Sequence, residues 1–374
     1  MKSAVTLADI PNEEPQPGIC SNQMQSGPIV PGHAGTEYVP TRAMIDESRR
    51  WANGSRLHIF FLNGTDAWGQ IVRQAVRDIA PIWSDYANIT FQFDAPDAHI
   101  SVNFIPLAQP QVGYGTYYSY IGRDCAGVIS REPSMCLVFD PRRLANNPAF
   151  MQKEFRRVIR HEFGHALGLI HEQSRPDRPI VWNEAVAIPY FQRQNRWSPD
   201  QIRQQILKTE TGGRLVGTMF DPTSIMMYQY PAEAGATING QPFATPENVE
   251  LSAMDKVLIN MAYPKEGVTQ PAEDVLVAGD PPKPGSIAQA GQVASYAFTP
   301  GAPGVFLVQT EGATPLLLAI QRDRAAAAGR LYATEGANLR MPIRLSESRE
   351  YYITVRHAKP IAGTGDFRIS VESV

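Results

Sequence analysis

The sequence has little cysteine, no long apolar run and no excess of charge of either sign. Its 374 residues include only three cysteines, and the net charge is −3. No apolar run approaches the roughly 20 residues that a membrane-spanning helix needs. Basic residues form no stripe of the kind that binds nucleic-acid phosphates. We therefore expect no membrane span and no nucleic-acid partner, and the 43% hydrophobic content in a chain of this length is enough for two domains.

The three cysteines are a spaced pair and a single residue. Cys125 and Cys136 bracket a short loop with a glycine and a proline. This spacing predicts a local disulfide in an oxidising compartment, and the alternative is two buried thiols that do not pair. Cys20 lies alone in residues 1–46, which are rich in Pro, Gly, Asn, Gln and Glu and lack any helical or strand period. That composition, without helical or strand periodicity, predicts an N-terminal segment without a core of its own.

Three of the seven histidines fall in one stretch, RHEFGHALGLIH, which covers residues 160–171. In a helix, residues four apart return to nearly the same direction, so His161 and His165 can hold one metal ion. Gly168 lies where a positive-φ turn would end the helix and bring His171 back as a third ligand. Three nitrogens leave a fourth position open for water, which is typical of a site with one catalytic zinc ion.

Glu162 flanks the metal-binding face, where a carboxylate can act as general base towards an attacking water. The alternative is a set of ordinary core or surface histidines, and a bare HExxH would leave that alternative open. The longer pattern HExxHxxGxxH, followed downstream by a turn that contains methionine, is typical of metzincin peptidases. The pattern therefore favours a catalytic zinc helix.

Other stretches resemble one metzincin family. Residues 171–178, HEQSRPDR, continue the metal motif and closely resemble the signature of the astacin family of zinc endopeptidases. Residues 51–54, WANG, resemble the start of that family's mature catalytic domain, and residues 224–228, SIMMY, resemble its Met-turn. Residues 251–263 are similar to its closing helix. The resemblance spans residues 48–264.

The resemblance implies roles for three further residues. Met226 would lie beneath the three histidines as a hydrophobic base. Tyr228 would be a further zinc ligand that leaves the metal when substrate binds and then donates a hydrogen bond to the developing oxyanion. Glu172 matches a position that meets the new N-terminus in processed members of the family, so we expect it to be unpaired or differently paired while the N-terminal segment is attached.

The chain also departs from the family. Met227 stands where the family usually has histidine, Pro179 stands where it usually has aspartate, and the N-terminal segment shows no clear aspartate switch. Cys20 then becomes the candidate inhibitory ligand, similar to the cysteine switch of the related matrix metalloproteinases, because a thiolate binds zinc strongly. The alternative is a free or packed cysteine. The cysteine pattern differs from the family's disulfide set, so its pairing is not transferred.

Short apolar runs predict the remaining secondary structure. A helical stripe from Trp68 to Trp83 predicts one helix. Residues 113–122, rich in Gly and Tyr, predict either an exposed edge strand beside the cleft or an irregular aromatic loop. Strands are predicted at residues 57–62, 89–93, 100–104 and 136–140, and later at 296–298, 305–308, 316–320, 351–355 and 367–371.

Together these elements predict an α+β fold, with a metzincin catalytic domain built on a twisted mixed sheet and the zinc helix, followed by a small all-β sandwich. The sandwich weakly resembles the C-terminal pre-peptidase domains of secreted bacterial proteases. The predicted parts are a pro-segment at residues 1–46, the catalytic domain at 47–265, a stiff linker at 266–284 and the sandwich at 285–374.

The function predicted from the sequence is a zinc-dependent endopeptidase that acts on proteins or peptides. Glu162 would activate the water on zinc, and the chain's own N-terminal segment would hold the enzyme latent through Cys20. One alternative is a zinc-containing protein-binding module with a permanently blocked site, and another is a hydrolase of non-peptide amides. We expect a secreted monomer, although the N-terminus has no apolar stretch long enough for a secretory signal.

Overall fold

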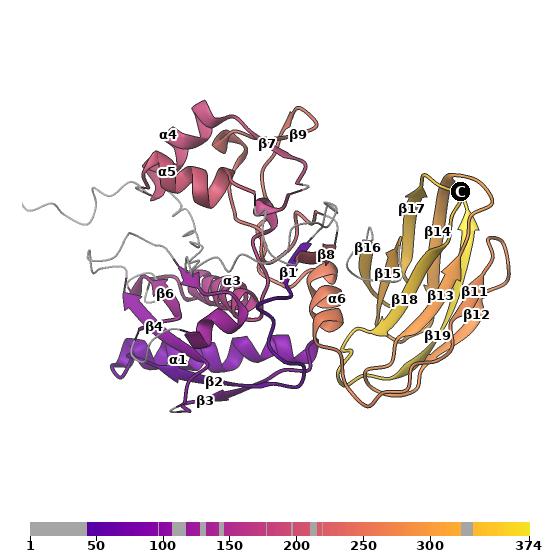
Figure 1. Cartoon of the computed structure of the whole chain (residues 1–374), viewed down its shortest axis with the longest axis horizontal. Coiled ribbons are helices and arrows are strands. Elements are labelled where there is room, and N and C mark those ends of the chain that lie inside the picture. The colour runs from indigo at the N-terminus through magenta and orange to yellow at the C-terminus, as the bar shows by residue number, and fades with distance from the viewer. Residues whose placement is uncertain are drawn as a thin grey trace, which may run out of the picture.

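The computed structural model describes most of the chain from residue 43 onward. The described residues are 43–95, 97–106, 117–127, 132–141, 146–176, 178–195, 197–209, 215–218, 220–322 and 332–374. Cys20 and its predicted latency contact lie outside them. Figure 1 shows a body of helices and sheets on the left and an all-β body on the right, so the α+β class is confirmed. Among the described residues no helix is long and apolar enough to span a bilayer.

A five-stranded mixed sheet forms the base of the helical body. Its order is β3-β2-β4-β6-β5, and all neighbours are parallel except β5, which runs antiparallel to β6. The strands are β2 (Arg56–Phe61), β3 (Thr90–Phe93), β4 (Ile100–Pro106), β5 (Tyr118–Ser119) and β6 (Met135–Phe139). Alternate residues of β2 and β4 are buried, which is why their apolar period predicted strands. The described part of the Gly- and Tyr-rich stretch supplies the edge strand.

Two long helices pack against each other over this sheet. Helix α1 (Ala67–Ile79) begins at Asp66, whose side chain accepts a hydrogen bond from the Gly69 amide. Helix α3 (Pro148–Ala166) begins in the same way at Asn147. The short helix η1 (Ala80–Asp85) follows α1 and places Trp83 against α3, where its Nε1 donates to the carbonyl of Arg160 at 3.1 Å. The 3₁₀-helix η2 (Gly122–Gly127) lies between β5 and β6.

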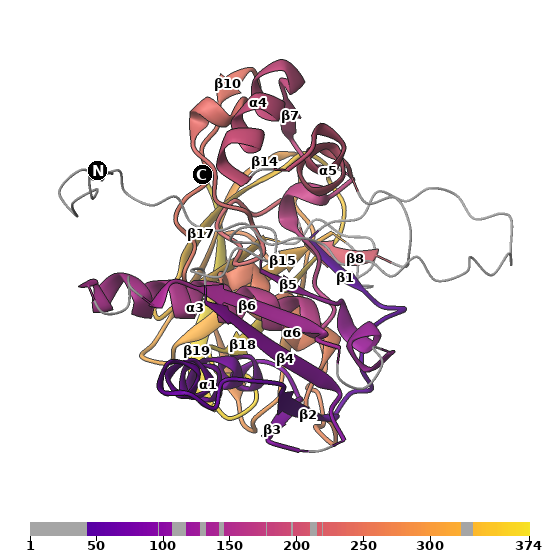
Figure 2. The same ribbon diagram turned by 90° about the vertical axis from the view of Figure 1, so that its left-hand side faces the viewer.

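A smaller lobe lies on the far side of α3 from β2 and β3, as Figures 1 and 2 both show. It has its own apolar core, which includes Phe191 and Tyr230. Its elements are η3 (Glu172–Ser174), β7 (Ile180–Trp182), α4 (Glu184–Asn195), α5 (Pro199–Ile202), the π-helix η4 (Arg203–Leu207), η5 (Ala232–Ala234), β9 (Ala236–Ile238) and β10 (Gln241–Pro242). Strands β10, β9 and β7 pair in that order.

Three further elements lie outside these groups. Strand β1 (Ala43–Asp46) pairs antiparallel with β8 (Leu215–Thr218). Helix α6 (Ala253–Ala262) begins at Ser252 with a capping box and lies between the helical body and the all-β body (Figure 1).

The all-β body is a sandwich of two sheets with the orders β11-β13-β18-β15-β16 and β12-β19-β14-β17. Its strands are β11 (Asp274–Leu276), β12 (Lys283–Ile287), β13 (Ala294–Phe298), β14 (Gly304–Glu311), β15 (Leu316–Gln321), β16 (Tyr332–Gly336), β17 (Arg340–Leu345), β18 (Tyr351–His357) and β19 (Gly365–Ser373). Side chains such as Val308, Ile353 and Ile369 fill one apolar core between the sheets. The predicted sandwich is confirmed.

The segment expected to be a linker, residues 266–284, differs from the prediction. It contributes β11, which pairs with β13, and the start of β12, which pairs with β19. Proline is compatible with β12 because this strand lies at the edge of its sheet, where Pro284 need not donate to a second neighbour. The sheets of the sandwich therefore begin at Asp274.

The predicted disulfide is absent from the structure. Cys125 and Cys136 are both free and buried. The Sγ of Cys125, in η2, donates to the carbonyl of Tyr120 at 3.2 Å, whereas Cys136 belongs to the interior strand β6. Burial raises the pKa of each thiol to about 12, so both are held in the neutral form. The alternative of two unpaired buried thiols is the one the structure has.

Candidate metal centre

The C-terminal end of α3 has the geometry that the motif predicted. The amide of Gly168 donates to the carbonyl of His165 at 2.8 Å, and the amide of Leu169 donates to the carbonyl of Gly164 at 3.0 Å. These two bonds form a Schellman motif, which needs a left-handed residue after the helix. Gly168 supplies it with a φ of +104°. The chain then reverses, and His171 returns beside the helix.

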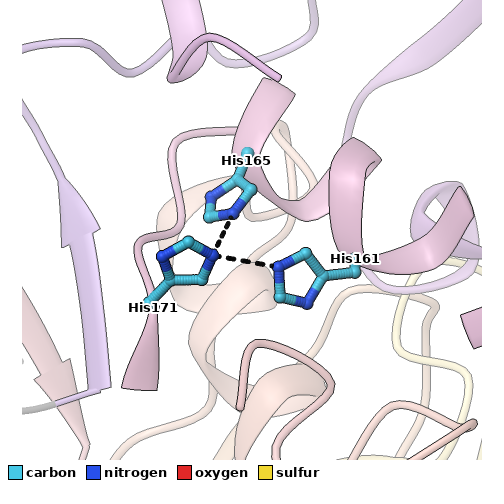
Figure 3. Close-up of side chains that lie close together, drawn as sticks. All are labelled: His161, His165 and His171. Atoms are coloured by element: carbon cyan, nitrogen blue, oxygen red, sulfur yellow. Dashed lines mark hydrogen bonds between the residues drawn. The ribbon is translucent and has the colours of Figure 1, made fainter. Parts of the chain in front are cut away.

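Three imidazoles meet at this turn, as Figure 3 shows. The Nε2 of His171 lies 2.9 Å from that of His165 and 3.1 Å from that of His161. All three side chains are buried, with exposed fractions of 5% or less. They are also the one group of three or more potential ligands that converge within the described residues. The structure therefore brings together the three predicted ligands.

The hydrogen bonds of the imidazoles fit a metal ion. Nδ1 of His161 bonds the carbonyl of Ile225 at 2.7 Å, and Nδ1 of His165 bonds the carbonyl of Leu169 at 2.8 Å. A carbonyl only accepts, so Nδ1 carries the proton and Nε2 presents a lone pair in both rings. Converging lone pairs repel each other unless a cation lies between them. Tetrahedral zinc bound at its usual distance would hold such nitrogens about 3.3 Å apart, close to the spacing here.

The surroundings also keep the imidazoles neutral, as metal ligands must be. Burial is the main cause that lowers the pKa of all three histidines, and it places that of His165 at about 4. The neighbouring imidazoles lower the pKa of His161 and His171 further. The Nδ1 of His171 is buried and has no hydrogen-bond partner among the described residues. The site is thus a desolvated donor set of three nitrogens.

The predicted Met-turn packs against the end of α3 that carries the histidines. Met226 is 1% exposed, and its Sδ packs against Gly164, where an added β-carbon would come within 2.5 Å of the sulfur. The same β-carbon would lie 3.2 Å from Cζ2 of Trp83. The carbonyl of Met226 accepts a hydrogen bond from the Glu172 amide at 3.1 Å, which ties the turn to the chain after His171. Glycine between the two histidine ligands therefore leaves the space that the methionine sulfur fills.

A buried carboxylate fixes the shape of this turn. Asp255, in the first turn of α6, accepts hydrogen bonds from Ser224 Oγ at 2.7 Å and from the Ile225 amide at 2.8 Å. The carbonyl of Ile225 in turn accepts from His161. Burial, more than any other cause, raises the pKa of Asp255 to about 6. The resemblance placed Asp255 within the closing helix but gave no sign that its carboxylate also holds the Met-turn.

The other predicted site residues surround the histidines. Glu162 follows His161 on α3 and is 1% exposed. The ring of Tyr228 lies 4.2 Å from that of His171, centroid to centroid. The Tyr228 amide donates to Oε1 of Gln173 at 3.1 Å. Gln173 lay within the family signature, but the sequence alone assigned it no role.

Glu172 forms a buried ion pair in this chain. Its Oε1 accepts from Arg175 at 2.6 Å and from the amide of Asp221 at 2.7 Å, and both charged side chains are almost fully buried. Desolvation outweighs these bonds and raises the pKa of Glu172 to about 7. The sequence placed Glu172 near the site, and its pairing with Arg175 could not be read from the sequence.

Comparison with known proteins extends these observations. The model of the Astacin peptidase family matches residues 151–264. The solved structure of myroilysin is 32% identical, with a TM-score of 0.51, and the match covers 60% of this chain and 99% of that one. A search of curated proteins found no match.

Two other solved structures are more distantly similar. One is to high choriolytic enzyme 1, a hatching enzyme zinc-protease of the medaka fish Oryzias latipes, with 18% identity, 58% and 95% coverage of this and that chain, and a TM-score of 0.39. The other is to the pre-peptidase C-terminal domain of a Bacillus anthracis collagenase, with 12% identity, 27% and 95% coverage, and a TM-score of 0.23. The histidine geometry and the match over nearly the whole of myroilysin agree: the chain belongs to the astacin family of zinc metalloendopeptidases.

Proposed function

We propose that this enzyme hydrolyses peptide bonds of protein or peptide substrates with Glu162 as general base and Tyr228 as oxyanion donor. The observation that carries the proposal is the convergence of three neutral imidazoles, two of them on the helix that also carries the buried Glu162. When bound there, zinc supplies a Lewis acid that polarises the scissile carbonyl and makes water acidic. The chain's own residues supply the proton transfers and the fixed geometry.

Glu162 is suited to proton transfer by its position. It follows His161 in α3 and is buried, with 1% of its surface exposed, so it belongs to the same end of the helix as two of the ligands. It would take a proton from the attacking water as the new carbon–oxygen bond forms, and would return that proton to the amine nitrogen as the peptide bond breaks. The proton is thus conserved across the cycle.

Tyr228 is suited to stabilise the negative charge that develops on the carbonyl oxygen. Its ring packs beside His171, and its backbone is held by Gln173. A neutral phenol can donate a hydrogen bond to an oxyanion without itself losing charge. The ring lies in contact with the ring of His171, one of the three ligands, and this position supports the role.

A substitution of Glu162 tests the general base. We expect Glu162→Gln to retain stoichiometric zinc and to lose about 10²- to 10⁴-fold in kcat on a peptide library, because the amide cannot accept the proton. Glu247→Gln is the matched control, since Glu247 pairs with Lys153 at the exposed side of α3. Parental turnover by the Glu162 variant would rule out this base.

Removal of one hydroxyl tests Tyr228. Tyr228→Phe keeps the ring packed on His171, so KM should change little. We expect kcat to fall about 10²- to 10³-fold, as for the loss of one oxyanion donor. A raised KM with an unchanged kcat would show a role in substrate binding in place of oxyanion stabilisation.

We also propose that the full-length chain is latent, with Cys20 as the inhibitory zinc ligand. The support is chemical: the site has three nitrogen ligands, and a thiolate is a strong fourth ligand for zinc. Cys20→Ala should give an unprocessed chain that cleaves peptides, whereas the parent should need removal of its N-terminal segment. A Cys20→Ala chain as inactive as the unprocessed parent would count against the switch. Secretion and a monomeric state stay predictions.

A further inference from the structure

One strand of the C-terminal sandwich, β15, is buried on both faces. In β15, Leu316, Leu318 and Ile320 point into the core of the sandwich. The alternate residues Leu317 and Ala319 are fully buried in the core of the helical body. Side chains alternate between the faces of a strand, so β15 belongs to two cores at once. The sandwich is therefore packed into the catalytic body through apolar contacts.

A buried arginine lies at this joint. Arg356 of β18 is 6% exposed, and its Nε donates to Oδ1 of Asn260 on α6 at 3.0 Å. Asn260 in turn donates from Nδ2 to the carbonyl of Tyr86 at 2.9 Å. Burial lowers the pKa of Arg356 to about 10, and no described carboxylate forms an ion pair with it. Its Nη1 donates to Oγ1 of Thr354 in the same strand at 2.8 Å, so the bond to Asn260 is its one hydrogen bond to α6 among the described residues. Burial of the charge costs solvation, and these directional bonds offset part of that cost.

Helix α6 carries these contacts towards the metal site. Asn260 faces the sandwich, and Asp255, five residues earlier and so at a different angle around the helix, bonds the Met-turn. The turn then holds His161 through the carbonyl of Ile225. One chain of hydrogen bonds and one helix thus connect Arg356 to a metal ligand.

We propose that the C-terminal sandwich braces the metal site by fixing helix α6, and that Arg356 is a positioning residue for His161. The sandwich then holds α6 in place, and α6 in turn holds the Met-turn through Asp255. The proposal concerns metal binding and does not depend on the roles of Glu162, Tyr228 or Cys20.

The test is the zinc affinity of the full chain, measured by competition with a chelator at neutral pH. Loss of a residue that bonds a metal ligand directly weakens metal binding about 10- to 100-fold. Arg356 acts from further away, so we expect Arg356→Met to weaken zinc binding about 3- to 10-fold. Amide hydrogen exchange at Ile225 and Met226 should rise with it. Parental zinc affinity and parental exchange would overturn the proposal.

Two further variants separate positioning from general loss of stability. Val308→Ala removes volume from the core of the sandwich on the opposite sheet, and we expect it to lower the melting temperature while zinc affinity stays within twofold. Asn260→Leu breaks the same contact from the α6 side and tests the proposal if Arg356→Met does not fold. It should weaken zinc binding to a similar extent. Equal weakening by Val308→Ala would mean that the sandwich acts only through stability.

Discussion

The catalytic body and the sandwich bury different kinds of group. Around the histidines the structure buries several charged or polar side chains: His161, Glu162, His165, His171, Glu172, Gln173, Arg175, Asp221 and Asp255. The sandwich buries mostly apolar side chains between its sheets, its other buried polar residues are uncharged (Thr310, Gln321, Thr354 and Ser370), and its buried arginine lies at the joint with α6. Desolvated polar groups cost stability, so they gather where chemistry requires them. The sandwich has a structural interior and the catalytic body a reactive one.

The largest expected effect comes from the removal of one partner of the buried ion pair between Arg175 and Glu172. Arg175→Met would leave the Glu172 carboxylate buried with only the Asp221 amide and no cation. We expect a loss of about 3–5 kcal/mol in the free energy of unfolding, measured with urea on zinc-loaded protein. The double variant Glu172→Gln with Arg175→Met should recover part of this loss, because no uncompensated charge remains.

Arg356→Met in the sandwich is the matched control for that variant. It leaves Oδ1 of Asn260 without its donor but leaves no buried carboxylate, so about 1–3 kcal/mol is expected. If the two arginine variants lose the same stability, the distinction between a reactive and a structural interior would be wrong.

A smaller loss is expected where the helix meets the Met-turn. Gly164→Ala would place a β-carbon 2.5 Å from Sδ of Met226 and 3.2 Å from Trp83. The methionine is enclosed, so we expect overpacking to cost about 1–3 kcal/mol in the free energy of unfolding and to weaken zinc binding. Gly127→Ala is the control, because its β-carbon would meet nothing within 4 Å. Equal stability of both variants would show that Met226 can move away from residue 164 at little cost.

Much of the site could be predicted because its spacing is local. His161 and His165 are one helical turn apart, and Gly168 needs a positive φ, so ligand geometry follows from short-range rules. The partners of these residues come from distant parts of the chain. Asp255 and Arg175 needed the fold to show what they bond, and Cys125 and Cys136 were close in sequence but lie in different buried settings.

The fold shows the same division between local and distant information. Alternating residues predicted the main strands, because one face of each is buried. The continuous apolar run of β15 marked a strand but could not show that its second face packs on another domain. Proline and glycine made residues 266–284 resemble a linker, whereas the backbone there extends both sheets. Short edge strands depend on their neighbours more than on their own residues.

The pH dependence of stability should show the raised pKa of Asp255 in the catalytic body. Its folded pKa of about 6 is above the ordinary 3.8, so between these values the folded state holds a proton that the unfolded state has lost. The contribution of Asp255 is therefore fully present below about pH 4 and is lost as the pH rises to about 6. The stability of the parent minus that of Asp255→Asn, measured by urea unfolding, should fall across this window. A flat difference would contradict the raised pKa.

The smallest effect is expected at the rim of the joint between the two bodies. Lys256 of α6 forms an ion pair with Glu335 of β16, and the side chains are 14% and 31% exposed. Lys256→Met keeps the stem over the ring of Tyr86 and removes only a partly solvated charge, so we expect a change of about 0–1 kcal/mol in the free energy of unfolding. Glu335→Gln should behave alike. A loss above about 2 kcal/mol would mean that charge at the rim holds the two bodies together, and the buried residues Leu317, Ala319 and Arg356 would then lose the role that their burial gives them.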